Sequence, residues 1–198
     1  MANPCLTPAV MPATTKTRFL MDERGQNSYK MDRSLFILQG NAMTSPVFRF
    51  AVRSDLPAIV ALLADDEKGK TREDFTDPLP DVYYRAFDAM ESTSSEALPN
   101  KYLLAVLGGD IVGCLQLTLI PGLSRQGRLR AQIEGVRVSS KHRGQKIGEA
   151  MILQAIEMSR ALGATLMQFT TDKSRGDAHR FYERLGFVAS HEGMKREL

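Results

Sequence analysis

The segment from Gln132 to Glu149, QIEGVRVSSKHRGQKIGE, constrains the fold of this chain more than any other. It begins with apolar residues at strand spacing, passes through a short polar turn, and opens into a helix with one apolar face. Gly144 and Gly148 flank the start of that helix and allow the backbone to approach a ligand closely. The first N–H groups of a helix lack partners within it and attract anions. The segment therefore predicts a site for a phosphate or diphosphate.

Two known phosphate-binding loops do not fit this segment. A Walker loop requires G-x-x-x-x-G-K-[ST], but Glu149 and Ala150 follow Gly148, and the spacing G-x-G-x-x-G is absent from it. The segment instead resembles the acetyl-CoA loop of the GNAT superfamily of N-acetyltransferases, [QR]-x-x-G-x-[GA] after a strand rich in Val and Ile. Arg143 and Gly148 match the two ends of this pattern, whereas Lys146 stands where the middle glycine is usual.

A second motif lies near the carboxyl terminus. The run AHRFYERLGF, residues 178–187, resembles the late GNAT motif A-x-x-[FLY]-Y-x-x-x-G-[FY]. The two motifs occur in the family's order, separated by one predicted helix and one predicted strand. The run from Asp177 to Tyr182, with Ser190-His191 after it, is most similar to the small-molecule branch that includes aminoalkylphosphonate acetyltransferases.

The apolar patterns predict an α/β (α+β) domain. We expect strands over residues 47–52, 101–107, 111–120, 130–138, 165–171, 187–189 and 194–198, and helices over 56–63, 81–91, 147–162 and 177–185. Ser54 or Asp55 is expected to cap the first helix, Asp177 the last, and Gly108-Gly109-Asp110 to form a hairpin turn. The resemblance implies the GNAT fold, a central mixed, mostly antiparallel twisted sheet of six to seven strands flanked by about four helices.

Two regions are expected along the chain. Residues 1–45, with early prolines and few apolar residues, predict a flexible N-terminal extension, and residues 46–198 the N-acetyltransferase domain. The absence of acidic residues from the first 21 positions is a faint sign of a transit peptide. An alternative is that the natural chain starts at Met43.

Composition narrows the possible partners. A net charge of +3 requires no nucleic acid partner, and no apolar run reaches the length of about 20 residues that spans a membrane. Cys5 and Cys114 form neither a disulfide framework nor a zinc motif, so we expect a cytoplasmic protein without a metal. Basic residues are expected to crowd around the predicted phosphate loop: Arg125, Arg128, Arg130, Arg137, Lys141, Arg143 and Lys146.

The resemblance implies acetyl-CoA as cosubstrate. It places the backbone of the strand residues Val136, Arg137 and Val138 beside the pantetheine arm, with the Val138 N–H stabilising the carbonyl oxygen. Gly135 can let that strand bulge. The implied phosphate donors are the N–H groups of Arg143, Gly144, Gln145, Lys146, Ile147, Gly148 and Glu149. A further contact, from Ser174 or Arg175, is open because Arg175 stands where many relatives have asparagine.

Acetyl transfer to an amine also needs an acid and a base. Tyr182 aligns with the family's tyrosine near the thioester sulfur and is the candidate general acid, although a core tyrosine would give the same pattern. Glu134 is the candidate base, acting directly or through water, although a solvated strand glutamate is an equal alternative. His191 and His179 are further candidates for the base.

The resemblance implies an acetyl-CoA-dependent N-acetyltransferase that acts on a primary amine of a small molecule by direct attack in a ternary complex. A protein or peptide N-acetyltransferase and a catalytically weak acyl-CoA-binding sensor stay open, as does a homodimer. Residues 65–84 and the last two strands are expected to form the acceptor pocket. The acidic residues there could attract a cationic amine or form a solvated surface: Asp65, Asp66, Glu67, Glu73 and Asp74.

Overall fold

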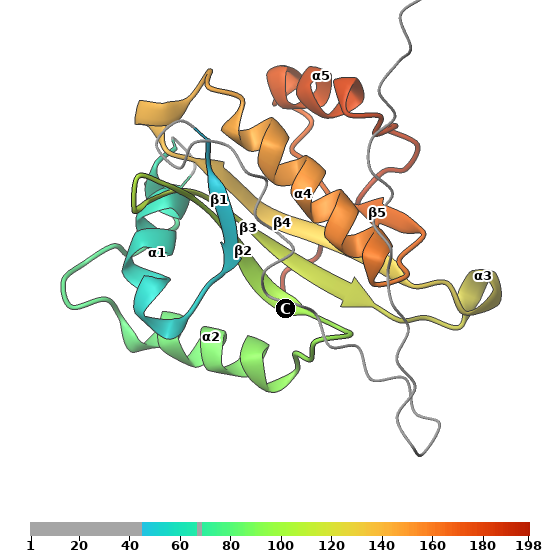
Figure 1. The fold of residues 1–198 in the computed structure, drawn as a ribbon, viewed down its shortest axis with the longest axis horizontal. Coiled ribbons are helices and arrows are strands. Elements are labelled where there is room, and N and C mark those ends of the chain that lie inside the picture. Colours follow the sequence, from blue (N-terminus) through green and yellow to red (C-terminus); the bar gives the residue numbers. More distant parts are fainter. Residues whose placement is uncertain (1–44, 67–68) are drawn as a thin grey trace, which may run out of the picture. The chain divides into compact units, whose positions relative to one another are not determined.

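The structure is a computed structural model that describes residues 45–66 and 69–198. The predicted N-terminal extension lies outside these residues except for its last position. The elements of the described part are, in chain order, β1 (Val47–Phe50), η1 (Arg53–Asp55), α1 (Leu56–Ala64), α2 (Asp81–Ser92), β2 (Asn100–Leu107), β3 (Asp110–Ile120), α3 (Ser124–Gly127), β4 (Arg130–Val138), η2 (Ser140–His142), α4 (Ile147–Ala161), β5 (Leu166–Gln168) and α5 (Gly176–Arg184) (Figure 1).

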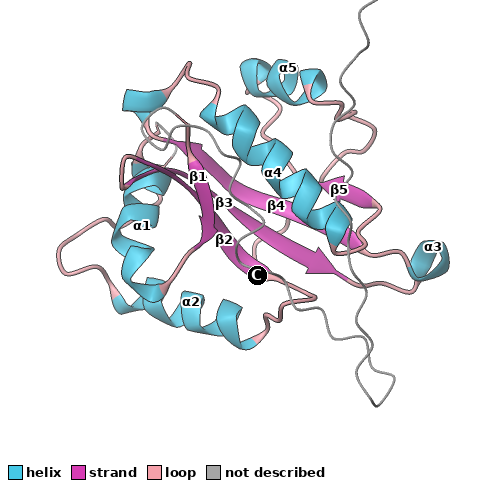
Figure 2. Ribbon diagram, viewed as in Figure 1, coloured by secondary structure: helices cyan, strands magenta, loops and turns pink. Residues whose placement is uncertain are grey.

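One mixed sheet forms the centre of the domain, in the order β1-β2-β3-β4-β5. The first four strands pair antiparallel, and β5 lies parallel to β4. One face carries an apolar cluster with Met151 and Ile152 of α4, against which α5 also packs; the other face carries a cluster with Ile59 of α1 and Phe87 of α2 (Figure 2). This is the predicted α/β arrangement of a mostly antiparallel sheet between helices.

The hairpin between β2 and β3 shows why the sequence predicted it. Gly108 and Gly109 have φ values of 60° and 96°, in the left-handed region that favours glycine. Their backbone brings Leu107 opposite Asp110 and starts a long antiparallel pair. The turn starts this pair, and a register shift between Ala105 and Val106 then sets Leu104 opposite Cys114, both on the α1 and α2 face.

The predicted cap position at Asp55 is confirmed, whereas the one at Asp177 is wrong, and neither aspartate makes a side-chain capping bond. Asp55 is the N-cap residue of α1, but its carboxylate makes no capping bond; it accepts hydrogen bonds from the Arg49 guanidinium at 2.6 and 2.9 Å. Helix α5 begins one residue before the predicted cap, so Asp177 lies in the first turn and pairs with Arg180. In both places the carboxylate forms a charge-assisted pair with an arginine, and that of Asp55 also accepts the Val52 N–H at 2.8 Å.

The sheet has five strands rather than the predicted six to seven. Residues 187–198, which include both missing strands, form no helix or strand. Val188 and Met194 are 81% and 96% exposed, so this segment buries too little apolar surface to hold a strand against the sheet. The charged residues interspersed there further favour solvent over a sheet edge.

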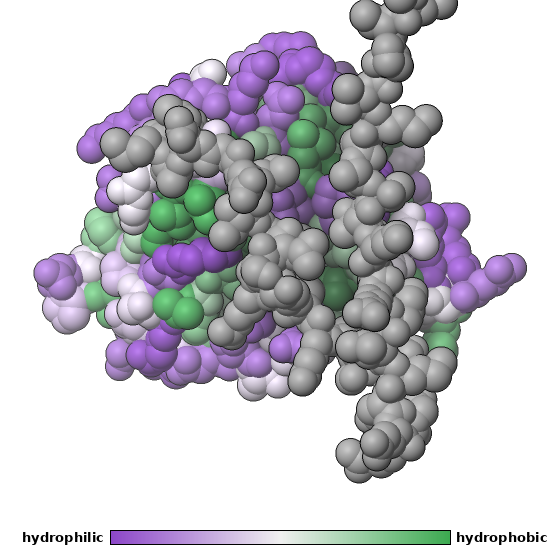
Figure 3. Space-filling model, in the orientation of Figure 1, coloured by the Kyte–Doolittle hydropathy of each residue, from purple (hydrophilic) through white to green (hydrophobic). Residues whose placement is uncertain are grey.

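The outer side of α2 is hydrophilic (Figure 3), as expected for a helix in which Phe87 alone is fully buried. None of the helices in residues 45–66 and 69–198 combines the length and the apolar character needed to span a membrane.

Candidate active site

A bulge in β4 lies at the centre of the candidate site. Gln116 of β3 is opposite Glu134, but Cys114 is opposite Arg137, so β4 contains one extra residue at this point. Gly135 takes up the bulge with a φ of 58°. A Cβ atom there would be in ordinary contact with the Tyr102 hydroxyl oxygen, at 3.4 Å, so it is the backbone angle that favours glycine. The predicted bulge at Gly135 is present.

Just before the bulge, β4 separates from β5. The two strands pair only from Arg130↔Leu166 to Gln132↔Gln168, whereas β4 continues to Val138. The Ser139 N–H donates to the Val112 carbonyl at 2.9 Å. Gly113 and Val138 therefore form an antiparallel pair that exchanges no hydrogen bonds of its own, and the Val138 N–H points away from β3. This N–H is directed toward the edge where β5 has departed.

The loop after β4 leads to the exposed start of α4. Gly144 and Lys146 have φ values of 78° and 59°, and α4 begins at Ile147 without a side-chain cap. The first backbone bond of the helix runs from the Ala150 N–H to the Lys146 carbonyl at 3.0 Å. The N–H groups of Ile147, Gly148 and Glu149 precede it and have no partner within the helix.

Lys146 occupies the position where the GNAT pattern has its middle glycine, and its backbone angle is one that glycine favours. A residue with a Cβ atom in this conformation costs about 1–2 kcal/mol. At Gly148, a Cβ would lie 3.5 Å from Val138 Cγ2, so the start of α4 packs closely on β4. The lysine departs from the sequence pattern but keeps the backbone path of the loop.

A cavity of about 750 Å³ opens beside β4 and the starts of η2 and α5. Five of the predicted cofactor-binding residues line it, namely Val136, Arg137, Val138, Arg143 and Ser174. The remaining lining residues are Asp65, Asp66, Lys70, Ser140, Arg175, Gly176, Asp177 and Ala178. The predicted residues from Gly144 to Glu149 continue from Arg143 into α4 and are not among its lining residues.

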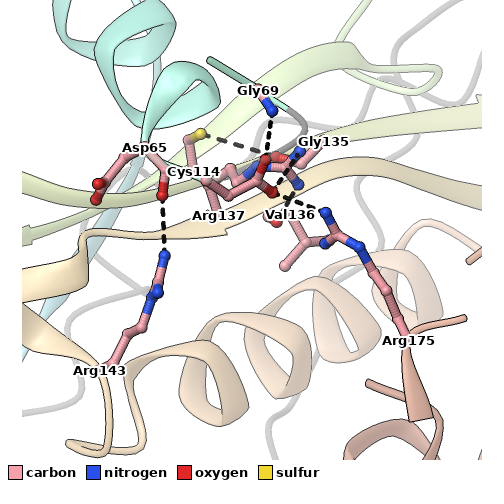
Figure 4. Close-up of polar contacts among 9 residues, drawn as sticks. Asp65, Gly69, Cys114, Gly135, Val136, Arg137, Arg143 and Arg175 are labelled. Atoms are coloured by element: carbon pink, nitrogen blue, oxygen red, sulfur yellow. Dashed lines mark hydrogen bonds and ion pairs between the residues drawn. The ribbon is translucent and has the colours of Figure 1, made fainter. Parts of the chain in front are cut away.

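Two aspartates at the end of α1 interact with arginines of the site, Asp65 through its backbone carbonyl oxygen and Asp66 through its carboxylate (Figure 4). The Asp65 carboxylate accepts from the Ser140 N–H at 2.6 Å, and its carbonyl oxygen accepts from Arg143 Nη2 at 2.9 Å. One oxygen of Asp66, Oδ2, lies 2.9 Å from Arg175 Nη2 and 3.3 Å from Arg137 Nη2. These contacts join the end of α1 to β4, to the loop before α4 and to the start of α5.

The arginines and backbone donors keep both carboxylates ionised. Burial is the largest influence on Asp66 and opposes ionisation, but the hydrogen bonds from Arg175 and the Gly69 N–H and the charge of Arg137 together lower its pKa to about 2. The hydrogen bond from the Ser140 N–H is the largest influence on Asp65 and lowers its pKa. The acidic run is thus partly neutralised within the site, and Asp66 is not a solvated surface group.

Tyr182 lies on α5, with its ring in an aromatic cluster. Its ring centroid is 4.1 Å from that of Phe169, 5.0 Å from that of Phe181 and 5.9 Å from that of Phe187. Burial raises the pKa of the phenol, and the charges of Arg137 and Arg175 oppose this shift. Tyr182 is thus a partly buried residue that packs against the core cluster on the α4 face, and the charges of two arginines of the cavity act on the pKa of its phenol.

Glu134 lies on the other face of the sheet. Its register neighbours are Gln116 and, beyond it on β2, Tyr102, which belongs to the α1 and α2 cluster. The side chain is exposed, and its charge contributes to the raised pKa of Tyr102, although burial is the main cause. The two predicted catalytic groups, Glu134 and Tyr182, therefore lie on opposite faces of β4.

Other predicted groups lie outside the cavity or have local partners. Nε2 of His179 lies 3.3 Å from the Asp172 carbonyl oxygen, and Nδ1 of His191 lies 2.8 Å from Ser190 Oγ; neither histidine lines the cavity. Ser174 lines it, with its hydroxyl donating to Asp172 at 2.7 Å. In residues 45–66 and 69–198, no three or more His, Cys, Asp or Glu side chains gather as metal ligands would.

The predicted crowding of all seven basic residues around the loop is wrong. Arg125 and Arg128 line a separate cavity with Gly163 and Thr165, and Arg128 Nη2 donates to the Thr165 carbonyl at 2.9 Å. They precede β4, whereas the phosphate loop follows it, and an extended strand of this length separates its ends by about 25 Å. Sequence proximity was therefore a poor guide to spatial proximity here.

Three comparisons with known proteins bear on this site. The sequence model of the Acetyltransferase (GNAT) family matches residues 63–187. Aminoalkylphosphonate N-acetyltransferase of Salmonella typhimurium is 38% identical over 90 residues, which are 46% of this chain and 58% of that protein. Glucosamine 6-phosphate N-acetyltransferase of Trypanosoma brucei brucei is 36% identical over 91 residues, 46% of this chain and 59% of that protein. The chain thus aligns with less than two thirds of each of these relatives.

Among solved structures, one described as a transcriptional regulator from Bacillus halodurans C-125 is 46% identical, with a TM-score of 0.73. The match covers 77% of this chain and 99% of that one. Because the family match covers more than half of the sequence, this chain belongs to the Acetyltransferase (GNAT) family.

Proposed function

We propose that this protein is an acetyl-CoA-dependent N-acetyltransferase that acetylates a primary amine of a small molecule by direct attack in a ternary complex. Family membership supports acetyl transfer, and both curated relatives are named N-acetyltransferases. The observation that carries the proposal is the open edge of β4, which directs the Val138 N–H toward the gap left by β5. At the end of this edge, α4 presents its uncapped start.

The loop fits the diphosphate of coenzyme A. A Cβ atom added at Gly144 would have no other atom within 4 Å, so the backbone there is open to a ligand. No side chain caps the first-turn N–H groups of α4. We assign diphosphate binding to the backbone of Arg143, Gly144, Gln145, Lys146, Ile147, Gly148 and Glu149. Val136, Arg137 and Val138 would hold the pantetheine arm, and Ser174 a further part of the coenzyme. When bound, acetyl-CoA supplies the acetyl group as a thioester.

The chain itself would supply three functions. The Val138 N–H donates a hydrogen bond to the carbonyl oxygen as negative charge develops there. Tyr182 carries its proton at neutral pH, as an ordinary phenol does, and burial raises its pKa further, so the hydroxyl is available to protonate the leaving thiolate. Glu134 accepts the proton of the amine, directly or through water. The positions of these two side chains on opposite faces of β4 suit an amine and a thiolate on opposite sides of the carbonyl.

The acceptor belongs to the same proposal. The names of both curated relatives describe substrates that combine an amine with a phosphonate or phosphate group. The end of α1 and the loop after it reach the cavity through Asp65, Asp66 and Lys70, which supports the assignment of this region to the acceptor pocket. We also infer a cytoplasmic location, consistent with the free thiol of Cys114.

A second candidate function is an acyl-CoA-binding sensor with little catalytic activity. Lys146 in place of the loop glycine favours it, and so does the description of the similar Bacillus halodurans protein as a transcriptional regulator. Thiol release from acetyl-CoA, measured with a panel of small amines and peptides, tests the main proposal. Amine-dependent release supports the enzyme. Saturable acetyl-CoA binding without release on any amine or peptide would favour the sensor.

A further inference from the structure

The ion-pair cluster at Asp66 contains more positive than negative charge. The single carboxylate oxygen Oδ2 serves both Arg137 and Arg175, while the other oxygen accepts the Gly69 N–H. The Asp66 and Arg137 side chains are 15% and 17% exposed. Two guanidinium groups thus share one carboxylate; solvent screens the charges of Asp66 and Arg137 only partly, whereas the Arg175 side chain is 37% exposed.

Arg137 also has unused hydrogen-bonding capacity. Its Nη1 donates to the Val136 carbonyl oxygen at 2.9 Å and its Nη2 lies beside Asp66, but its Nε is buried without a partner among the described residues. A buried hydrogen-bond donor without a partner lowers the stability of the fold. The oxygens of a tetrahedral oxyanion can accept hydrogen bonds from several donors at once. Arg137 and Arg175 both line the cavity, so an anion there could reach them.

The direction of Arg137 indicates which ligand this anion would belong to. Val136 and Val138 pack against the cluster on the α4 face, whereas Arg137 lies opposite Cys114, which belongs to the cluster on the α1 and α2 face. The proposed diphosphate site is at the start of α4. The Arg137 side chain therefore leaves β4 on the face opposite α4 and reaches Asp66 at the end of α1, within the cavity that Val136, Val138 and Arg143 also line.

We propose that Arg137 and Arg175 form a subsite for the phosphate or phosphonate group of the acceptor, and that Asp66 occupies this subsite until the acceptor displaces it. This inference rests on the proposed function for the identity of the acceptor. Asp66 acts as an internal anion that keeps the two arginines in place and competes with the substrate. Arg137 and Arg175 are substrate-binding residues in this account, and Asp66 is a displaceable gate.

The test is calorimetric or NMR titration with methylphosphonate and with inorganic phosphate, which requires no turnover. Wild type is expected to bind methylphosphonate weakly and saturably. Arg137→Gln and Arg175→Gln should each weaken binding by about tenfold or more, since each removes a charged donor. Asp66→Asn removes the competitor and should tighten binding by about tenfold. Equal affinity of wild type and Asp66→Asn would overturn the gate.

Matched controls come from an exposed pair of the same type. Arg53 and Asp88 are joined at 3.2 Å, but their side chains are 58% and 57% exposed. Arg53→Gln and Asp88→Asn make the same chemical changes and should leave methylphosphonate binding unaltered. If these variants shift the affinity as much as the cavity variants do, the effect is one of net charge and the subsite is refuted. Circular dichroism checks that each variant is folded. If Arg175→Gln does not fold, Arg175→Lys, which retains the charge, is titrated in its place.

The phosphate groups of coenzyme A are the other source of such an anion, and a second titration separates the two. With coenzyme A at saturation, methylphosphonate should still bind to an acceptor subsite. Loss of binding in competition with coenzyme A would assign the arginines to the coenzyme and overturn the proposal. If coenzyme A does not bind but methylphosphonate does, the proposed function fails while the anion subsite stands. If coenzyme A binds and neither wild type nor Asp66→Asn binds methylphosphonate, only the subsite fails.

Discussion

The backbone N–H of Ser140 donates to the Asp65 carboxylate at 2.6 Å, although the two residues are 75 positions apart in the chain. This bond holds the end of α1 against the entrance of the loop that leads to α4. The adjacent Asp66 makes the second connection, to Arg137 and Arg175. Two neighbouring carboxylates thus join the segments around the candidate active site.

These carboxylates make the stability of the fold depend on pH. Both pKa values are lowered by folding, that of Asp66 from 3.8 to about 2. A carboxylate with a lowered pKa stabilises the folded state above its unfolded pKa, and this contribution is lost as the pH falls through the folded pKa. We expect the free energy of unfolding to fall between pH 3.8 and about 2, as urea titrations would measure.

Asp66→Asn should lower the free energy of unfolding at neutral pH by about 1–3 kcal/mol, because it leaves two guanidinium groups with a weaker partner. It should also make the acid loss of stability shallower, since one of the titrating groups is gone. Asp88→Asn, at an exposed ion pair, is the control and should change neither quantity appreciably. An unchanged acid slope in Asp66→Asn would show that this carboxylate is not the titrating group.

Tyr182→Phe tests the proposed general acid. The phenylalanine ring retains the contacts with Phe169, Phe181 and Phe187, so the fold and the affinity for acetyl-CoA should change little. Without the phenol, kcat should fall by about 100-fold or more. Steady-state kinetics with an active amine measures this. A normal kcat in the Tyr182 variant would leave it only a packing role.

Glu134→Gln tests the proposed base. The loss of activity should be greatest at low pH, where the acceptor amine is most fully protonated and depends most on a base. The measurement is kcat/KM of variant and wild type across the pH range. Glu157→Gln, at an exposed pair on α4, serves as the matched control. A ratio to wild type that does not vary with pH would argue against the role of Glu134.

Lys146→Gly tests the strain in the phosphate loop. Removing the Cβ from a residue at a φ of 59° should raise the free energy of unfolding by about 0.5–1 kcal/mol, after allowing for the greater freedom of glycine in the unfolded chain. It should also tighten acetyl-CoA binding, because the backbone can approach the diphosphate more closely.

Gly144→Ala is the companion variant to Lys146→Gly. It places a Cβ at a φ of 78° where nothing lies within 4 Å, and should lower the free energy of unfolding by about 1 kcal/mol through backbone strain alone. Urea titrations measure both changes. Destabilisation by Lys146→Gly would contradict the assigned strain.

The elements predicted from local signals agree with the structure. Strand β4 spans the predicted residues 130–138, and α4 begins at the predicted Ile147, because apolar spacing and the glycines around them act within a few residues. The bulge at Gly135 could likewise be predicted from the sequence, since an isolated glycine in a strand often marks a bulge. The same local reasoning supplied the hairpin at Gly108 and Gly109.

The features that could not be predicted from the sequence depend on contacts between residues that are far apart in the chain. Asp66 and Arg175 are 109 positions apart, and no local pattern indicates that an acidic residue after the first helix contacts an arginine before the last. The C-terminal strands were predicted over residues 187–189, a short apolar run, and over residues 194–198, but a strand needs a neighbouring strand as well as a pattern. The arginines before β4 were misplaced because a strand separates its two ends.

The central claim is that the start of α4 binds the diphosphate of coenzyme A while β4 holds its arm. Hydrogen–deuterium exchange with and without coenzyme A tests it most directly, because the proposed donors are backbone N–H groups. The account predicts slower exchange in peptides that cover residues 143–149 and 136–138, saturating with the binding isotherm. Two results would contradict this claim: coenzyme A fails to bind to the folded protein, or it binds and leaves hydrogen exchange at the start of α4 unchanged.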